Sequence, residues 1–151
     1  MKKSILVLAM AFIAISVNAQ KVKEADVAPA AKASFVKLHP SAKVDKWEHE
    51  GINWEAEYTE GGVETSVEFG PNGQLLATET EIAVTALPKG VADYCAKNMA
   101  GKKIKEASKI IAANGTVSYE AEVDEADYIF DSNGSFLKKV VEAKDADDEK
   151  K

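Results

Sequence analysis

The feature that most constrains the fold of this chain is an internal repeat. Four pairs of segments match in the same order along the chain: residues 29–35 with 88–94, 42–46 with 101–105, 54–58 with 119–123, and 69–76 with 130–137. The offset between matched segments runs from 59 to 65 residues, as expected if small insertions fall in turns. The sequence therefore predicts two copies of one structural unit of roughly 60 residues.

Each copy begins with a helical pattern. Pro29 and Pro88 suit the first turn of a helix, where the missing N–H of proline costs nothing. In the first copy, apolar residues recur at the spacing of one helical face at Ala31, Phe35 and Leu38. The matching face of the second copy comprises Val91, Tyr94, Cys95 and Asn98.

After each helix the apolar period changes to two. Residues 52–58, 63–69 and 76–82 alternate between an apolar or small side chain and a polar one, a pattern typical of half-buried antiparallel strands. Asn-Gly pairs at 72–73, 114–115 and 133–134 predict tight turns. The expected fold is α+β, with two tandem repeats of one helix packed on an antiparallel β-sheet.

The N-terminus has the parts of a secretory signal peptide. Lys2 and Lys3 precede an apolar run over residues 4–17, which is short for a membrane span, and the run ends in small residues suited to cleavage after Ala19. We expect a periplasmic or secreted protein that has no membrane span after cleavage. The predicted layout is a signal peptide (1–19), a linker (20–25), the first repeat (26–84), the second repeat (85–142) and a disordered acidic tail (143–151).

Composition argues against several functions. The net charge of the chain is −6 and it contains no arginine, which disfavours nucleic acid as a partner. The single Cys95 excludes an intramolecular disulfide and a cysteine-rich zinc site, and it is best explained as a buried apolar residue. His39 and His49 have no metal-ligand spacing around them. We expect no enzyme, no metal site and no cofactor, and a hydrolase using Cys95 or a histidine is the weakest hypothesis.

The non-apolar face of the first copy is rich in glutamate. If its strands are neighbours, one sheet surface carries six carboxylates, at Glu55, Glu57, Glu64, Glu68, Glu79 and Glu81. The plain explanation is solubility. The functional alternatives are a docking face for a basic partner, or a weak surface for a divalent cation such as calcium. The second copy keeps fewer acids on this face, Glu120, Glu122 and Asp127, and has Lys138 or Lys139 close by. Residues 131–134 resemble a calcium loop faintly but are better explained as a turn.

Several of these segments together resemble a known family. The proline-led helix, the strand entry at residues 40–44, Trp47, the WEAEY strand at 54–58 and the FxxNGxxL hairpin, all after a signal peptide, resemble the PepSY-like proteins of the Bacteroidetes envelope. These are also called beta-lactamase-inhibitor-like proteins. The resemblance covers about residues 26–142 and departs in the second copy, where residues 98–100 (NMA) replace a Pro-Ser helix ending and Ala107 replaces the tryptophan.

The resemblance implies tandem helix-plus-sheet units, export from the cytoplasm and no known catalysis. A shared fold warrants little about function. We therefore expect an exported, non-catalytic binding module, an inhibitor or regulator of an envelope protein, that docks a basic protein or peptide through the acidic sheet face or the hairpin loops. The alternative from another class is a periplasmic protein that responds weakly to calcium.

Overall fold

The computed structural model describes residues 19–141. Within this range the chain forms two α-helices, α1 (Pro29–Leu38) and α2 (Lys89–Asn98), and one antiparallel sheet of nine strands. The strands are β1 (Ala19–Val22), β2 (Val44–Glu50), β3 (Asn53–Glu60), β4 (Val63–Phe69), β5 (Leu75–Glu81), β6 (Ala107–Ala112), β7 (Val117–Glu122), β8 (Asp127–Asp131) and β9 (Phe136–Val140). The α+β class expected from the sequence is confirmed. The predicted signal peptide, apart from Ala19, and the predicted acidic tail lie outside the described residues.

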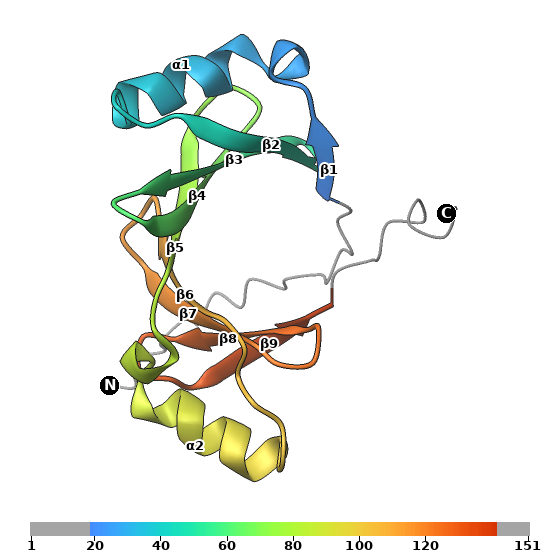
Figure 1. Cartoon of the computed structure of the whole chain (residues 1–151), viewed down its shortest axis with the longest axis vertical. Helices are drawn as coiled ribbons and strands as arrows, with labels where there is room; N and C mark the ends of the chain where they lie inside the picture. The colour runs from blue at the N-terminus through green and yellow to red at the C-terminus, as the bar shows by residue number, and fades with distance from the viewer. Residues whose placement is uncertain (1–18, 142–151) are drawn as a thin grey trace, which may run out of the picture.

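The sheet is strongly bent, and both helices lie on its outer side. Each strand pairs with the next one in sequence, so the sheet has no crossover. Figure 1 shows α1 over the end formed by β1–β4 and α2 over the opposite end, formed by β7–β9. After β1, each half of the chain contains a short 3-10 helix, an α-helix and four strands in that order, and the β5–β6 pairing joins the halves. Their interpretation as tandem repeats stays a prediction.

The first apolar core lies between α1 and the outer face of β2–β4. Phe35 is buried against the rings of Trp47 and Tyr58, with centroid separations of 6.0 and 5.2 Å. Leu38, expected on this face, is instead 46% exposed. Because α1 ends there, the place beside Phe35 is taken by His39, whose ring lies 5.4 Å from that of Phe35 and contacts the Tyr58 hydroxyl.

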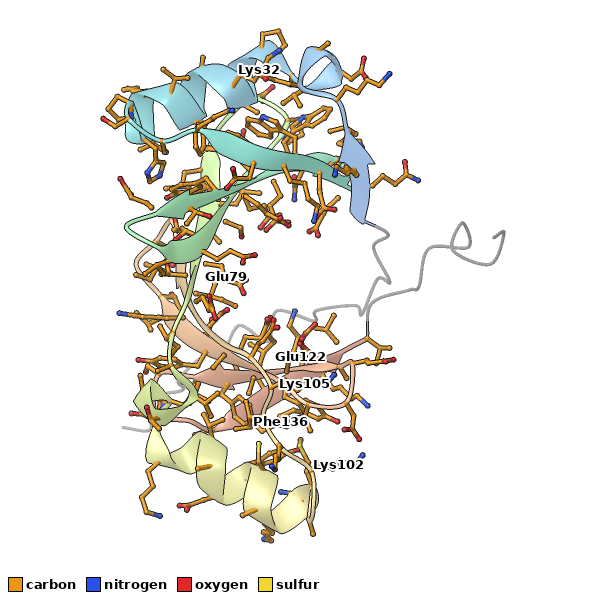
Figure 2. The ribbon with its side chains drawn as sticks, viewed as in Figure 1. Lys32, Glu79, Lys102, Lys105, Glu122 and Phe136 are labelled. Carbon is orange, nitrogen blue, oxygen red and sulfur yellow. The ribbon has the colours of Figure 1, made fainter. Side chains whose placement is uncertain are left out.

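The second core repeats this arrangement under α2. Val91 and Cys95 of the helix are buried against Phe130 of β8. Tyr94 is half-buried and stacks on Phe136 of β9, with ring centroids 4.7 Å apart; Figure 2 labels Phe136 where the strands meet α2. Asn98 differs from the expected apolar face, because it is exposed and its amide donates to the Tyr94 carbonyl. The apolar side chains of both halves thus converge on the outer face of the sheet.

Two Asn-Gly turns bring hairpin loops into contact with the helices. Gly73, with φ of +76°, lies so close to α1 that a Cβ there would be 2.5 Å from the Ala30 carbonyl oxygen. The Ser34 hydroxyl of α1 donates a hydrogen bond of 2.7 Å to the Gly73 carbonyl. In the second half, Gly134 makes the same approach to Gly90 of α2. Only glycine combines the left-handed backbone with this close packing.

Part of the segment predicted to be a linker, residues 20–25, pairs with the sheet. Gln20, Lys21 and Val22 belong to β1, which pairs antiparallel with β2, and Val22 opposes Trp47. Val22 also packs against the first core. This four-residue edge strand is held by pairing to a distant segment, so its local sequence gives little indication that a strand forms.

The contact between Gly73 and α1 can be tested against a matched glycine. Gly62 also has a positive φ, of +83°, but a Cβ there would meet no atom within 4 Å. We expect Gly62→Ala to lower the free energy of unfolding by about 1–2 kcal/mol from backbone strain alone. Gly73→Ala adds a clash with α1 and should cost about 2–4 kcal/mol. Urea denaturation measures both, and equal losses would contradict the packing role assigned to Gly73.

An acidic cleft on the concave face as the candidate functional site

The inner, concave face of the bent sheet forms a cleft of about 950 Å³. All six glutamates singled out from the sequence line it, contributed by β3, β4 and β5. They meet because alternate residues of neighbouring strands point to the same face while the apolar residues between them point to the helices. Figure 2 labels Glu79 on β5, near the middle of the bent sheet, and Glu122 on β7 in the second half. The sequence thus predicted the surface on which these residues gather.

The cleft is more acidic than the six residues alone suggest. Its lining contains thirteen carboxylates and two lysines, Lys46 and Lys138. Glu48 and Glu50 of β2 add two carboxylates to the first half of the lining. They were not predicted, because the alternating pattern was followed only from residue 52 onward. Glu106 and Glu125, which flank strands of the second half, were also not anticipated. Their positions depend on how the sheet bends, which no local pattern reports.

In the first half of the cleft, like charges lie directly opposite each other on neighbouring strands. Glu48 of β2 opposes Glu55 of β3, and Glu55 in turn opposes Glu68 of β4. Such pairs are unfavourable when both members are ionised. The cost is reduced by hydrogen-bond donors placed between the carboxylates, the most important of which is a lysine.

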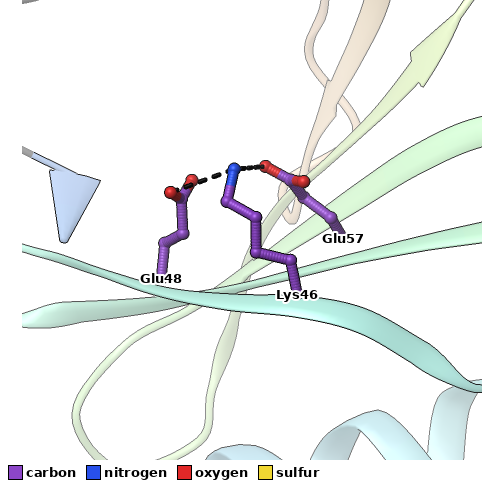
Figure 3. A network of polar contacts seen from close by, with 3 residues as sticks. All are labelled: Lys46, Glu48 and Glu57. Atoms are coloured by element: carbon purple, nitrogen blue, oxygen red, sulfur yellow. Dashed lines mark hydrogen bonds and ion pairs between the residues drawn. The ribbon is translucent and has the colours of Figure 1, made fainter. Parts of the chain in front are cut away.

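Lys46 joins two of the glutamates. Its ammonium group lies 3.0 Å from Glu48 Oε1 and 2.8 Å from Glu57 Oε1, as Figure 3 shows. Burial lowers the pKa of Lys46, but the hydrogen bonds and charges of Glu57 and Glu48 outweigh this effect and hold it above its usual range. Lys46 is therefore a resident cation in this part of the cleft.

Two other glutamates are held by neutral donors. The Asn53 amide donates a hydrogen bond of 2.8 Å to Glu68 Oε1, and the Ser66 hydroxyl donates to Glu55. Burial raises the pKa of Glu55 to about 7, with further contributions from the charges of Glu50, Glu79 and Glu57 and against the lowering effect of Ser66. Glu55 therefore exchanges its proton near neutral pH.

The second half of the cleft has a different character. The acids expected there, Glu120, Glu122 and Asp127, line it together with Lys138. Lys105 forms an ion pair of 3.3 Å with Glu122, and both are labelled in Figure 2. This half also contributes the larger aliphatic lining residues, which are Ile110, Ile129 and Val140.

The other candidate residues have structural explanations. Cys95 is buried, burial raises the pKa of its thiol, and the described residues of its cluster include no histidine. The His49 ring packs against that of Trp54 in a tilted arrangement, with ring centroids 4.3 Å apart. Asp131 accepts hydrogen bonds of 2.8 Å from the amides of Asn133 and Ser135, so residues 131–134 form a turn, as the sequence indicated.

Known structures share this fold. A DUF2874 family protein from Bacteroides uniformis is 18% identical with a TM-score of 0.64, over 75% of this chain and 88% of that one. A protein from Bacteroides eggerthii described as periplasmic is 16% identical with a TM-score of 0.64, over 75% and 87%. A BLIP-like protein from Bacteroides fragilis is 25% identical with a TM-score of 0.59, over 78% and 89%. No family model matches the sequence, and a search of curated proteins finds no match.

These neighbours support the beta-lactamase-inhibitor-like fold expected from the sequence, and none of the three is described as an enzyme. A periplasmic neighbour agrees with the location that the predicted signal peptide indicates. Among the described residues, neither helix is long and apolar enough to cross a membrane.

The raised pKa of Glu55 predicts a pH dependence of stability. The folded state holds the proton up to about pH 7, whereas the unfolded state releases it near 4.5, so the stabilising contribution of protonated Glu55 is lost as the pH rises between these values. We expect Glu55→Gln to be more stable than the wild type at pH 8 by roughly 1–3 kcal/mol, with the difference vanishing near pH 4.5. Denaturant unfolding of both proteins between pH 4.5 and pH 8 measures this difference in stability. A difference that stays constant over this range would contradict the raised pKa of Glu55.

Proposed function

We propose that this protein is an exported, non-catalytic binding module that docks a basic segment of an envelope protein in its acidic cleft. The observation that carries the proposal is the concentration of carboxylates on the concave face, thirteen against two lysines. Electrostatic complementarity between such a surface and a basic partner speeds encounter and selects against acidic partners. A partner that brings cations would also relieve the repulsion between facing glutamates.

A plain solubility role accounts less well for this arrangement. Carboxylates kept for solubility gain most when they are spread over the outer surface and fully hydrated. Here many of them face one another in a concavity, and Glu55 is desolvated enough to lose its charge near neutral pH. A surface that accepts this cost is better explained by a role in binding.

The proposed location and role draw on the structural neighbours. One neighbour is described as periplasmic and another as BLIP-like, which supports export and a role as inhibitor or regulator of an envelope protein. The absence of catalysis is supported by the buried Cys95 and by histidines engaged in ring contacts.

The docking proposal is tested with a labelled oligolysine peptide. Glu57→Gln/Glu68→Gln/Glu79→Gln removes three charges from the cleft, and we expect it to weaken binding at least about tenfold at low salt and to flatten the salt dependence. Fluorescence anisotropy measures the affinity. The control is Glu24→Gln/Asp26→Asn/Glu60→Gln, which changes the net charge equally at exposed positions that do not line the cleft. Equal losses in both variants would contradict docking in the cleft.

A calcium-responsive role is the second candidate. Carboxylate oxygens of Glu48, Glu55 and Glu57 lie within 4.8 Å of one another, close enough to share a cation. Lys46 weighs against this role, because its ammonium already contacts two of the three. A bound calcium ion would have to displace it.

This competition gives a direct test. We expect calcium at about millimolar concentration to leave the Tm of the wild type unchanged and to raise the Tm of Lys46→Met, because the variant leaves the three carboxylates without their resident cation. Differential scanning calorimetry with calcium, with magnesium and without either separates the cases. A clear rise of the wild-type Tm in calcium would favour the cation function over docking.

A further inference from the structure

The two halves of the cleft differ in chemistry in a way that specifies its occupant more closely. The half formed by β2–β5 contributes eight glutamates, a single lysine and, apart from Ala77, no apolar residue. The half formed by residues 106–140 contributes five carboxylates and the aliphatic side chains of Ile110, Ile129 and Val140. The concave face therefore has a carboxylate wall and a mixed wall that contains aliphatic groups.

The aliphatic residues belong to the inner face by their position on the strands. Ile110 follows Lys109 on β6 and points into the cleft, whereas the next residue, Ile111, does not line it and is 42% exposed elsewhere. Val140 opposes Asp127 at the edge strand β9. Ile110 and Val140 are half-buried, so part of their apolar surface still faces solvent in the cleft.

We infer that the occupant of the cleft is an amphipathic basic polypeptide segment, whose lysine or arginine side chains face the glutamates of β2–β5 while its aliphatic side chains contact Ile110 and Val140. This inference rests on the proposed docking function and deepens it. Charge complementarity selects the basic side, and removal of aliphatic surface from water selects the apolar side. A purely hydrophilic polycation would satisfy the first wall and leave the aliphatic groups in water.

The test compares two labelled peptides of equal length and charge, one in which lysine alternates with leucine and one in which lysine alternates with serine. We expect the lysine–leucine peptide to bind the wild type about five- to tenfold more tightly, as expected from burial of a modest apolar area. The ratio should persist when salt is raised, because screening weakens the charge contacts of both peptides equally.

Paired substitutions locate the preference within the cleft. Ile110→Thr/Val140→Thr should reduce the affinity ratio to about twofold or less, since it replaces the two half-buried aliphatic groups with β-branched polar residues that suit strands. The control Ile111→Thr/Val141→Thr changes the two adjacent residues, which do not line the cleft, and should leave the ratio unchanged. Circular dichroism confirms that each variant is folded, and the comparison of peptides on the wild type stands if one is not.

The outcomes separate the two proposals. If both peptides bind equally to the wild type, the occupant is selected by charge alone. If the control pair changes the ratio as much as the cleft pair, the preference does not come from Ile110 and Val140. Either result overturns this inference while docking stands. If neither peptide binds, or if the charge-neutralised cleft variant binds both as the wild type does, the docking function itself fails.

Discussion

Two ten-residue helices cannot cover both faces of a nine-stranded sheet. Apolar side chains must leave water, so they gather on the one face that the helices cover. The opposite face then has to be polar, and it is free to curve because nothing packs against it within the described residues. Bending brings the polar residues of distant strands toward each other, so Glu55 of β3 and Asp127 of β8 line one cleft. The cleft therefore follows from the shortage of helical cover in this fold.

The chemistry of the cleft is governed by how its charges are compensated. Within residues 19–141, every buried side-chain nitrogen and oxygen has a hydrogen-bond partner. In the first half, Lys46 compensates the charges of Glu48 and Glu57, and the Asn53 amide donates a hydrogen bond to Glu68. A neutral donor satisfies the lone pairs of a carboxylate but does not remove its charge. Burial is the main cause of the high pKa of Glu55, and the charges of Glu50, Glu79 and Glu57 add to it.

Much of this structure could be predicted where the pattern was local. Alternation identified β3–β5, and the same alternation placed Glu55, Glu68 and Glu79 on one face. β6 was harder, because the adjacent Ile110 and Ile111 make both faces apolar and hide the period of two. β1 depends on pairing with β2 across more than twenty residues. The aliphatic groups of the second wall, Ile110, Ile129 and Val140, were not predicted either, because their place in the cleft depends on the bend of the sheet.

The two halves of the chain share an order of elements but present different inner surfaces. The positions that contact the helices are similar in both, with Phe69 and Phe130 fully buried and Gly73 and Gly134 packed on the helices. Inner positions are under no such packing constraint, so they can change without loss of the fold. In register across the sheet, Glu79 of β5 opposes Ile110 of β6, and the character of the surface changes at the pairing that joins the halves. A single groove with one carboxylate wall and one mixed wall distinguishes the two sides of whatever lies in it, which a uniformly acidic groove would not do. If a segment docks as proposed, its orientation is set by the fold, because the two walls are fixed to opposite halves of one continuous sheet.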